Sequence, residues 1–308
     1  MDVLDAALEY IRTNFSDVPC RLGELMAKHT SFRIGGPVRA MLFPRSAGEL
    51  AELLSSLVQL DVLPLVIGNG TNLLADDAPM DIIAIKTTSC NAARGTGENE
   101  ITAEAGVSLA QLAALAYESG LTGLEFAHGI PGTLGGAVSM NAGAYGGELK
   151  DVVYSTEVFT PNAGISSLDN ADHSFSYRYS KLLNAGIIAL SSVIRLKKGD
   201  AGEIKALMDD YSARRRESQP LDMPSAGSTF KRPEHGFAAE LIENSGLKGC
   251  RIGGAQVSEK HAGFIINSAG ATFSDVTALM EHVRETVLRQ TGIRLEPEVR
   301  IVRRGLWN

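Results

Sequence analysis

The stretch HGIPGTLGGAVSMNAGAYGGE, residues 128–148, limits the choice of fold most, because seven of its 21 residues are glycine. Glycine loses more freedom on folding than any other residue, so such a stretch is either a flexible linker or a closely approached backbone. A linker would be polar, whereas this one also carries Ile130, Leu134, Val138 and Met140. We therefore expect a packed segment whose backbone lies close to a partner.

A second glycine-rich loop, GNGTNLL (68–74), follows the apolar run at residues 63–67. A dinucleotide fingerprint would need glycine at position 73, where Leu73 stands, and no helix clearly follows, so the Rossmann interpretation fails. The loop still offers successive backbone N–H groups, the Thr71 hydroxyl and the Asn69 and Asn72 amides, which is typical of a phosphate-binding nest. Two such loops suit a flat, phosphate-bearing cofactor; ordinary turns between core elements are the alternative.

Composition excludes several classes of protein. A net charge of −7 gives no nucleic-acid footprint, so an anion must be bound by a local group of donors. Cys20, Cys90 and Cys250 lie far apart, which argues against a disulfide framework or a zinc site, and we expect no metal. The first residues lack the features of a signal peptide, and no apolar run reaches the roughly 18 residues that span a membrane. We expect a cytoplasmic protein.

Hydrophobic periodicity predicts helices over residues 46–58, 108–120 and 274–292, and a further helix leading into ARRRES (213–218). Short β-like runs lie between them, at residues 64–68, 81–86, 152–159, 187–196, 263–268 and 298–302. Helices and strands mix without strict alternation, which favours the α+β class. Composition shifts place domain boundaries near residues 88 and 200, giving parts 1–88, 89–200 and 201–308.

Four further motifs are ambiguous when each is taken alone. Ser228 in SAGSTFKRP is not in a G-x-S-x-G elbow, and Arg178 in YRYS is equally typical of a structural arginine. Glu298 begins a terminal strand, where a carboxylate is usually only solvated. The run at residues 214–216 is either a solvated charge run or a diphosphate clamp.

Seven ordered blocks together resemble the UDP-N-acetylenolpyruvoylglucosamine reductase family, flavoenzymes of peptidoglycan precursor synthesis also called UDP-N-acetylmuramate dehydrogenases. The blocks are HTSFRIGGP, PLVIGNGTNLL, GIPGTLGGAVSMNAGAYG, SYRYS, QPLDMPSAGSTFKRP, GGAQVSEKHAGFIIN and LEPEVRIV, which span about residues 28–302. The chain is similar to the shorter type, which lacks an insertion carrying an extra substrate-gripping tyrosine. The resemblance implies the FAD-binding fold of vanillyl-alcohol-oxidase-like enzymes, with two α+β subdomains (1–88 and 89–200) holding FAD and an α+β substrate domain (201–308).

The resemblance also implies a site and a reaction. FAD, bound without a covalent link, would pass a hydride from NADPH to the enolpyruvyl double bond of the UDP-sugar. Ser228 matches the family's proton donor, and Arg178 and Glu298 match its pair at the substrate carboxylate. The residues expected at FAD are Gly68, Asn69, Gly70, Thr71, Asn72, Leu73, Gly129, Ile130, Pro131, Gly132, Gly135, Gly136, Ala137, Asn141 and Gly143. Those expected at the substrate are Tyr145, Arg214, Arg215, Lys231, Gln256, His261 and Asn267.

One residue departs from the pattern of many relatives: Arg232 replaces an amide that can contact substrate, so either Arg232 contacts the diphosphate or that contact is absent. We expect no nucleic-acid or membrane partner and a monomer. Two rivals stay open at this point. A flavin oxidase of the same fold would take electrons from an alcohol, and a binding protein for nucleotide sugars would purify colourless.

Overall fold

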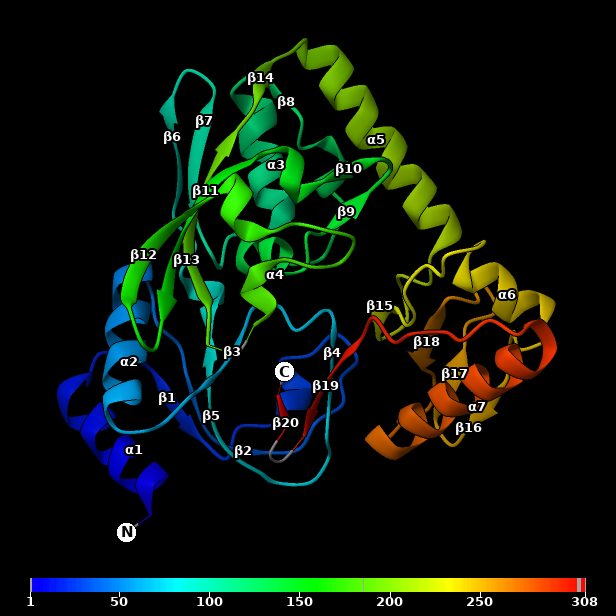
Figure 1. Cartoon of the computed structure of the whole chain (residues 1–308), viewed down its shortest axis with the longest axis horizontal. Helices are drawn as coiled ribbons and strands as arrows, with labels where there is room; N and C mark the ends of the chain where they lie inside the picture. Colours follow the sequence, from blue (N-terminus) through cyan, green and yellow to red (C-terminus); the bar gives the residue numbers. More distant parts are fainter. Residues whose placement is uncertain (1, 185, 304–305, 308) are drawn as a thin grey trace. The chain divides into compact units, whose positions relative to one another are not determined.

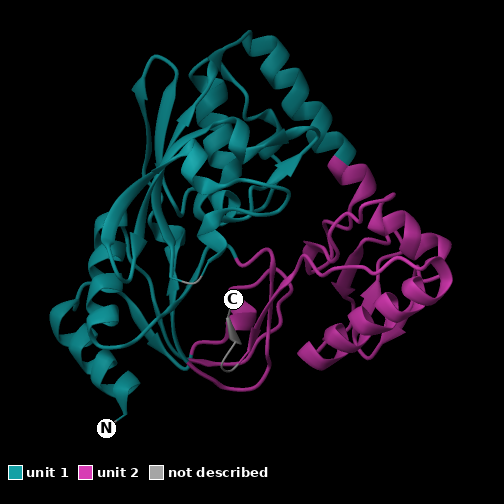
Figure 2. Ribbon diagram, viewed as in Figure 1, with its two compact units in different colours: residues 1–23, 39–69, 82–214 teal, residues 24–38, 70–81, 215–308 magenta. Residues whose placement is uncertain are grey.

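The computed structural model describes residues 2–184, 186–303 and 306–307. It divides into two compact units, coloured in Figure 2. Unit 1 comprises residues 1–23, 39–69 and 82–214, and unit 2 comprises residues 24–38, 70–81 and 215–308. Two segments from the first 81 residues thus belong to the same unit as the C-terminal third. The expected division into 1–88, 89–200 and 201–308 stays a prediction.

The first sheet of unit 1 has the strand order β1-β2-β5-β3. Its strands are β1 (Cys20–Leu22), β2 (Val38–Leu42), β5 (Met80–Lys86) and β3 (Leu65–Ile67), and β3 runs parallel to β5. Helices α1 (Val3–Asn14) and α2 (Ala47–Gln59) pack together and share one hydrophobic cluster with this sheet (Figure 1). The predicted helix over 46–58 is confirmed, and the Ser46 side chain accepts from the backbone N–H of Glu49, as an N-cap does.

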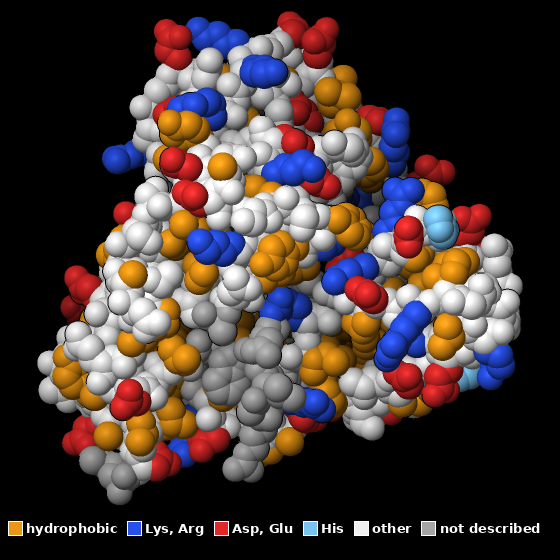
Figure 3. Space-filling view, viewed as in Figure 1, with side chains coloured by type: hydrophobic (Ala, Val, Ile, Leu, Met, Phe, Trp, Pro, Cys, Tyr) orange, Lys and Arg blue, Asp and Glu red, His pale blue; other side chains and the backbone are white. Residues whose placement is uncertain are grey.

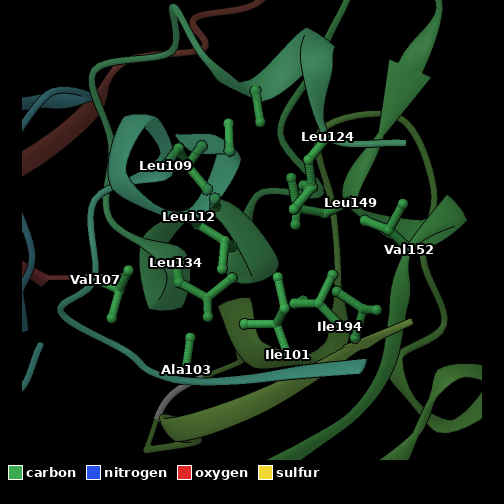
Figure 4. Close-up of a cluster of buried hydrophobic side chains, with 14 of the residues drawn as sticks. Ile101, Ala103, Val107, Leu109, Leu112, Leu124, Leu134, Leu149, Val152 and Ile194 are labelled. Atoms are coloured by element: carbon green, nitrogen blue, oxygen red, sulfur yellow. The ribbon is translucent and has the colours of Figure 1, made fainter. Parts of the chain in front are cut away.

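The second sheet of unit 1 is antiparallel, with the order β12-β11-β13-β7-β6. Its strands are β12 (Gly164–Asp169), β11 (Val153–Thr160), β13 (Ile188–Arg195), β7 (Glu100–Glu104) and β6 (Ala93–Gly97). Helices α3 (Leu109–Glu118) and α4 (Leu134–Ser139) pack against it, so Leu112 and Leu134 lie with Ile101 and Ile194 in one buried cluster (Figure 4). Ser108 caps α3, and Gly120 follows it with a φ of +67°.

The glycine-rich stretch is packed, as predicted, and contains a helix that periodicity did not show. Leu134 and Val138, four residues apart, are both fully buried on α4. A Cβ on Gly135 would lie 2.8 Å from the Cβ of Ala105, so only glycine lets α4 sit this close to the neighbouring chain. The stretch ends in a hairpin of β9 (Gly143–Ala144) and β10 (Gly147–Glu148).

Unit 2 contains a four-stranded sheet of order β15-β18-β17-β16. Its strands are β15 (Ser225–Ser228), β18 (Phe264–Asn267), β17 (Ala255–Val257) and β16 (Arg251–Ile252). Helices α6 (Ala238–Asn244) and α7 (Phe273–Thr291) pack on it. The predicted apolar face of α7 is buried, and Gly292 ends the helix with a φ of +73°. Its capping box of Thr272 and Asp275 was not predicted.

A smaller sheet of unit 2 joins distant parts of the sequence. Strand β19 (Arg300–Arg303) lies between β20 (Leu306–Trp307) and β4 (Leu73–Ala75), and it runs parallel to β4. Unit 1 contains a further short pair of strands, β8 (Leu121–Thr122) and β14 (Lys197–Lys198). Helix α5 (Ala201–Ser218) confirms the predicted helix before ARRRES, and the boundary between the units falls within it. The 3₁₀ helices are η1 (Met26–Lys28), η2 (Thr87–Ser89), η3 (Glu125–Ala127), η4 (Leu149–Asp151), η5 (Asn170–His173) and η6 (Lys181–Leu183).

All six β-like runs contain an observed strand, and the α+β class is confirmed. None of the helices in the described chain is long and apolar enough to cross a membrane. Over the same residues, no group of three or more His, Cys, Asp or Glu side chains could hold a metal ion. On the face drawn in Figure 3, basic side chains are interspersed with acidic ones.

Candidate active site

Within unit 1 the two glycine-rich segments lie against each other. The Asn69 side chain donates to the carbonyl oxygen of Pro131 over 3.3 Å. A Cβ on Gly68 would lie 2.0 Å from the Oγ1 atom of Thr133, so glycine is required for this contact. Pro131 and Gly136 remain exposed. The fold of unit 1 therefore brings together two segments about 60 residues apart in the sequence.

Beyond Asn69 the first loop belongs to unit 2. Gly70 has a φ of +65°, and a Cβ there would lie 2.2 Å from the carbonyl oxygen of His29. The Ser31 N–H donates to the Gly70 carbonyl, and the Ser31 hydroxyl donates to the carbonyl of Ser225 over 2.6 Å. Ser31 thus ties this loop to β15. Sequence reasoning gave it no role, although its block HTSFRIGGP was part of the resemblance.

The other residues expected at the cofactor are mixed in exposure. Ala137 is buried in the core of unit 1, and Ile130 packs against that core. The Gly132 carbonyl accepts from the Leu109 N–H. Leu73 begins β4, whereas Gly129 and Thr71 are partly exposed. At Ala137 only the backbone is left to face a ligand.

The β9–β10 hairpin presents Tyr145 in an unusual conformation. Its two loop residues, Tyr145 and Gly146, have φ values of +53° and +90°. Positive φ at both positions defines a type I′ turn, which favours Asn-Gly over a bulky first residue. The Tyr145 ring stacks on that of Tyr211 from α5, with centroids 4.5 Å apart and an angle of 7° between the planes. Its hydroxyl also donates to the Tyr211 carbonyl oxygen over 3.2 Å.

Arg178 lies near this hairpin, in a turn with strained backbone. Ser176 and Tyr179 exchange two backbone hydrogen bonds, and Arg178, with a φ of +55°, takes the third position of the turn. A type II turn prefers glycine or asparagine there. One guanidinium nitrogen donates to the Gly143 carbonyl oxygen over 3.4 Å.

Asn141 holds the β9–β10 hairpin and the turn that contains Arg178 together. Its amide donates to the Glu148 carboxylate and to the Ser176 carbonyl, each over 3.0 Å, and accepts from the Lys150 N–H. Burial raises the pKa of Glu148, but hydrogen bonds from Lys150 and Asn141 outweigh it and the net shift is downward. Asn141 is fully buried, so its side chain positions the site.

A β-bulge directs Ser228 in unit 2. On β15, Ser225 pairs with Ile266 and Ser228 with Phe264, so β15 carries one residue more than β18. Gly227 has a φ of +75°, the left-handed conformation typical of a bulge. Ser228 is exposed, whereas the neighbouring Thr229 is buried. The bulge therefore turns the Ser228 hydroxyl away from the core.

Glu298 lies on the chain beside Ser228. The Glu298 N–H donates to the Thr229 carbonyl over 2.8 Å, and Lys231 donates in turn to the Glu296 carbonyl. The Asn72 side chain donates to the Glu298 carbonyl oxygen over 3.1 Å. Unit 2 thus brings together Ser228, Glu298 and one end of the first glycine-rich loop. Arg178 belongs to unit 1.

Several residues expected at the substrate have protein partners. The Gln256 side chain is buried and donates to the Gly249 carbonyl. Asn267 donates to the Phe32 carbonyl and accepts from the Ala271 N–H. These contacts occupy both amides in holding unit 2 together.

The remaining residues expected at the substrate, together with Arg232, are also buried or in contact with protein groups. The His261 ring accepts from the Gly263 N–H, and burial lowers its pKa. Arg214 pairs with Asp210 one turn earlier on α5, and Arg215 is buried. Lys231 lies 3.5 Å from the carboxylate of Glu296, and the Arg232 guanidinium lies over the ring of Phe237.

Two family profiles match the chain. Residues 219–302 match the C-terminal domain of UDP-N-acetylenolpyruvoylglucosamine reductase, and residues 38–169 match an FAD binding domain. The chain is 50% identical over 281 residues to the UDP-N-acetylenolpyruvoylglucosamine reductase of Caldanaerobacter subterraneus subsp. tengcongensis, covering 91% of this chain and 93% of that protein. The reductase of Pediococcus pentosaceus is 44% identical over 288 residues, covering 94% and 96%.

A solved structure agrees with the sequence relatives. The crystal structure of UDP-N-acetylenolpyruvylglucosamine reductase from Thermus caldophilus superposes with a TM-score of 0.79 at 31% identity, covering 93% of this chain and 99% of that one. The match runs over both units of the chain.

Proposed function

This chain belongs to the UDP-N-acetylenolpyruvoylglucosamine reductase family, and we propose that the residues described above form its active site. The enzyme reduces the enolpyruvyl group of UDP-N-acetylglucosamine enolpyruvate, giving UDP-N-acetylmuramate for peptidoglycan synthesis. The observation that carries this conclusion is 50% identity over 91% of the chain. The fold is the FAD-binding fold of the vanillyl-alcohol-oxidase type, as expected.

The chain's residues fit FAD at the two glycine-rich loops. Gly136 is exposed, and a Cβ there would meet only the Oγ1 atom of Thr133, at 3.7 Å, so a ligand reaches bare backbone. The positions Gly68 and Gly70 are different, since there the close approach is to the protein itself. These two glycines shape the loop, and the Asn69 and Asn72 amides hold it to the Pro131 and Glu298 carbonyls. In our proposal the backbone beside these residues faces a ligand. When bound, FAD carries the hydride from NADPH to the vinyl group.

The three catalytic roles follow from the charge that develops on the substrate. Arg178 stabilises the substrate carboxylate as negative charge builds up, an effect typically of about 3–4 kcal/mol for one group. Glu298 is proposed to act together with Arg178 at this carboxylate, and Ser228 gives a proton to the carbon next to it. The exposed hydroxyl that the bulge presents supports the role of Ser228. Tyr145 is proposed to contact the UDP-sugar.

The remaining substrate residues divide by their contacts. Lys231 and Arg214 make exposed ion pairs, which a diphosphate can replace. The other four residues are proposed to support the site by fixing its backbone: Arg215, Gln256, His261 and Asn267. The monomeric state and the cytoplasmic location stay predictions; a sedimentation experiment at several protein concentrations tests the first.

The test separates the two half-reactions by stopped-flow absorbance. Ser228→Ala is expected to leave flavin reduction by NADPH near the wild-type rate. Reoxidation by the enolpyruvyl substrate should slow by about 10²- to 10⁴-fold, the usual contribution of a general acid. Ser268→Ala, in the same unit, is the matched control. If both half-reactions of the Ser228 variant stay fast, the proton-donor role is wrong.

Glu298→Gln tests the second residue of the pair. We expect the same selective loss, because only the step that places charge on the substrate needs the carboxylate. Slower reduction of the flavin by NADPH would contradict this role.

A further inference from the structure

Arg300, the first residue of β19, is a cation that the roles above do not use. Its side chain is half-buried. Within residues 2–184, 186–303 and 306–307, its guanidinium makes no hydrogen bond or ion pair, and burial alone lowers its pKa. Arginine stays charged in proteins, so the group is a partly desolvated charge that no carboxylate of the described chain neutralises.

The backbone around Arg300 joins it to the first glycine-rich loop. Arg300 pairs with Leu73 in the parallel ladder of β19 and β4, and its N–H donates to the Asn72 carbonyl over 3.0 Å. The Asn72 side chain donates to the Glu298 carbonyl. This ladder holds the side chain of Arg300 next to the last residues of the loop.

Arg300 and its neighbours in sequence differ in burial. Val299 is buried in the hydrophobic cluster of unit 2, whereas Glu298 and Arg300 on either side of it are each partly exposed. This segment therefore holds, two residues apart, a carboxylate proposed to be catalytic and an arginine with no partner among the described residues. Moving an arginine out of water costs free energy unless an anion compensates it, which indicates a ligand with negative charge.

We propose that Arg300 binds a diphosphate, and that the diphosphate is that of FAD. The inference rests on the proposed function, because the loop that Arg300 adjoins is the one assigned to FAD. Arginine suits this ligand, since its planar group can donate two parallel hydrogen bonds to phosphate oxygens. The diphosphate of the UDP-sugar has the same chemistry, and the experiment separates the two sources.

The experiment measures binding by the apoprotein, with flavin removed and then returned. Quenching of flavin fluorescence gives the dissociation constants of FAD and of riboflavin, which lacks the diphosphate. Arg300→Met should weaken FAD binding about ten- to a hundredfold, as loss of a charge-assisted hydrogen bond does. It should leave riboflavin binding unchanged and reduce the dependence of FAD affinity on salt. Arg303→Met, an exposed arginine on the same strand but on its other face, is the matched control.

A second measurement separates binding from folding. Because the guanidinium has no partner among the described residues, the Arg300→Met apoprotein should unfold at the wild-type urea midpoint or above it. A lowered midpoint, or equal loss of FAD and riboflavin binding, would show a structural role and overturn the proposal. Equal FAD binding by variant and wild type would do the same. Weaker binding of UDP to the holoenzyme with FAD affinity unchanged would overturn the assignment to the cofactor. If the wild-type apoprotein itself binds no FAD, the proposed function fails instead.

Discussion

At the scale of single residues, the candidate site is held in backbone conformations that ordinary side chains avoid. Asn141, Tyr145 and Arg178 all have positive φ. This costs about 1–3 kcal/mol at each of Tyr145 and Arg178, while asparagine tolerates it better. They persist because contacts compensate them: three hydrogen bonds at Asn141, a ring stack at Tyr145 and a turn closed by two hydrogen bonds at Arg178. The conformation of the candidate site therefore depends on contacts with neighbouring residues.

Tyr211 is such a neighbour. Tyr211→Ala removes the ring on which Tyr145 stacks, a contact of about 0.5–1.5 kcal/mol. We expect the KM for the enolpyruvyl substrate to rise up to about tenfold, while the rate of flavin reduction by NADPH stays unchanged. Tyr211→Phe should restore the wild-type KM, because the hydrogen bond from Tyr145 reaches the backbone carbonyl.

Steady-state kinetics with varied substrate checks this prediction. Tyr10→Ala, an exposed tyrosine on α1, is the control for loss of an aromatic ring in the same unit. A fall in kcat with KM unchanged in the Tyr211→Ala enzyme would show that the stack does not position a binding residue.

The sequence predicts residue types at the site better than it predicts their partners. The resemblance assigned catalytic roles to Ser228, Arg178 and Glu298. These roles stay predictions that the experiments above test. Gln256 and Asn267 are different, since their amides bind carbonyls of the protein. Which acceptor an amide meets depends on chain segments far away in sequence, so periodicity and composition carry no signal for it. Arg300 was not singled out, because only the three-dimensional structure shows that its guanidinium has no partner among the described residues.

At the scale of elements, the bulge in β15 decides where Ser228 points. Gly227→Ala should slow reoxidation of the flavin by substrate about tenfold or more, since the φ of +75° costs a residue with a Cβ about 1 kcal/mol or more. The backbone would relax and turn the hydroxyl. No atom lies within 4 Å of the added Cβ, so any loss comes from the backbone.

Two variants make the bulge prediction specific. Gly227→Asn should keep more activity than Gly227→Ala, because asparagine tolerates the left-handed conformation. Gly270→Ala carries the same kind of strain in the same unit, at φ +69° with open space around it. It should lower the unfolding midpoint without slowing reoxidation. Equal kinetics for the two alanine variants would refute the role of the bulge.

Long amphipathic elements were predictable, and short ones in glycine-rich sequence were not. The helices α2, α3 and α7 show regular apolar spacing and cap residues, and all three were predicted. In α4, six residues include two glycines, so intrinsic propensity opposes the helix and packing on Ala105 decides. Tertiary contact supplies what the local sequence lacks.

At the scale of the whole molecule, each unit contains a histidine, fully buried in one case and partly buried in the other, whose pKa is lowered by burial. His173 is fully buried in unit 1, where it hydrogen-bonds Thr156 and the Asp169 carbonyl, and His261 lies in unit 2. Below about pH 6.5 the unfolded chain takes up protons that the folded chain does not, so stability falls as the pH is lowered. Urea unfolding between pH 5 and pH 8 checks this.

Substitution identifies the groups responsible. His173→Gln should flatten the dependence of unfolding free energy on pH, because the titrating ring is gone. His235→Gln, at an exposed position, should leave the slope as in the wild type. A slope unaffected by the first change would mean that other groups cause the acid sensitivity.

The ladder of β4 and β19 has a consequence for synthesis on the ribosome. Leu73 leaves the ribosome long before its partner Arg300 exists. At roughly 5–20 residues per second, the nascent chain waits about ten seconds or longer for that strand. During this interval β4 is an unpaired edge with an apolar side chain, Leu74, whose later burial place is still untranslated. Chaperone capture of the nascent chain should therefore centre on residues 70–81 and end when the last strands emerge.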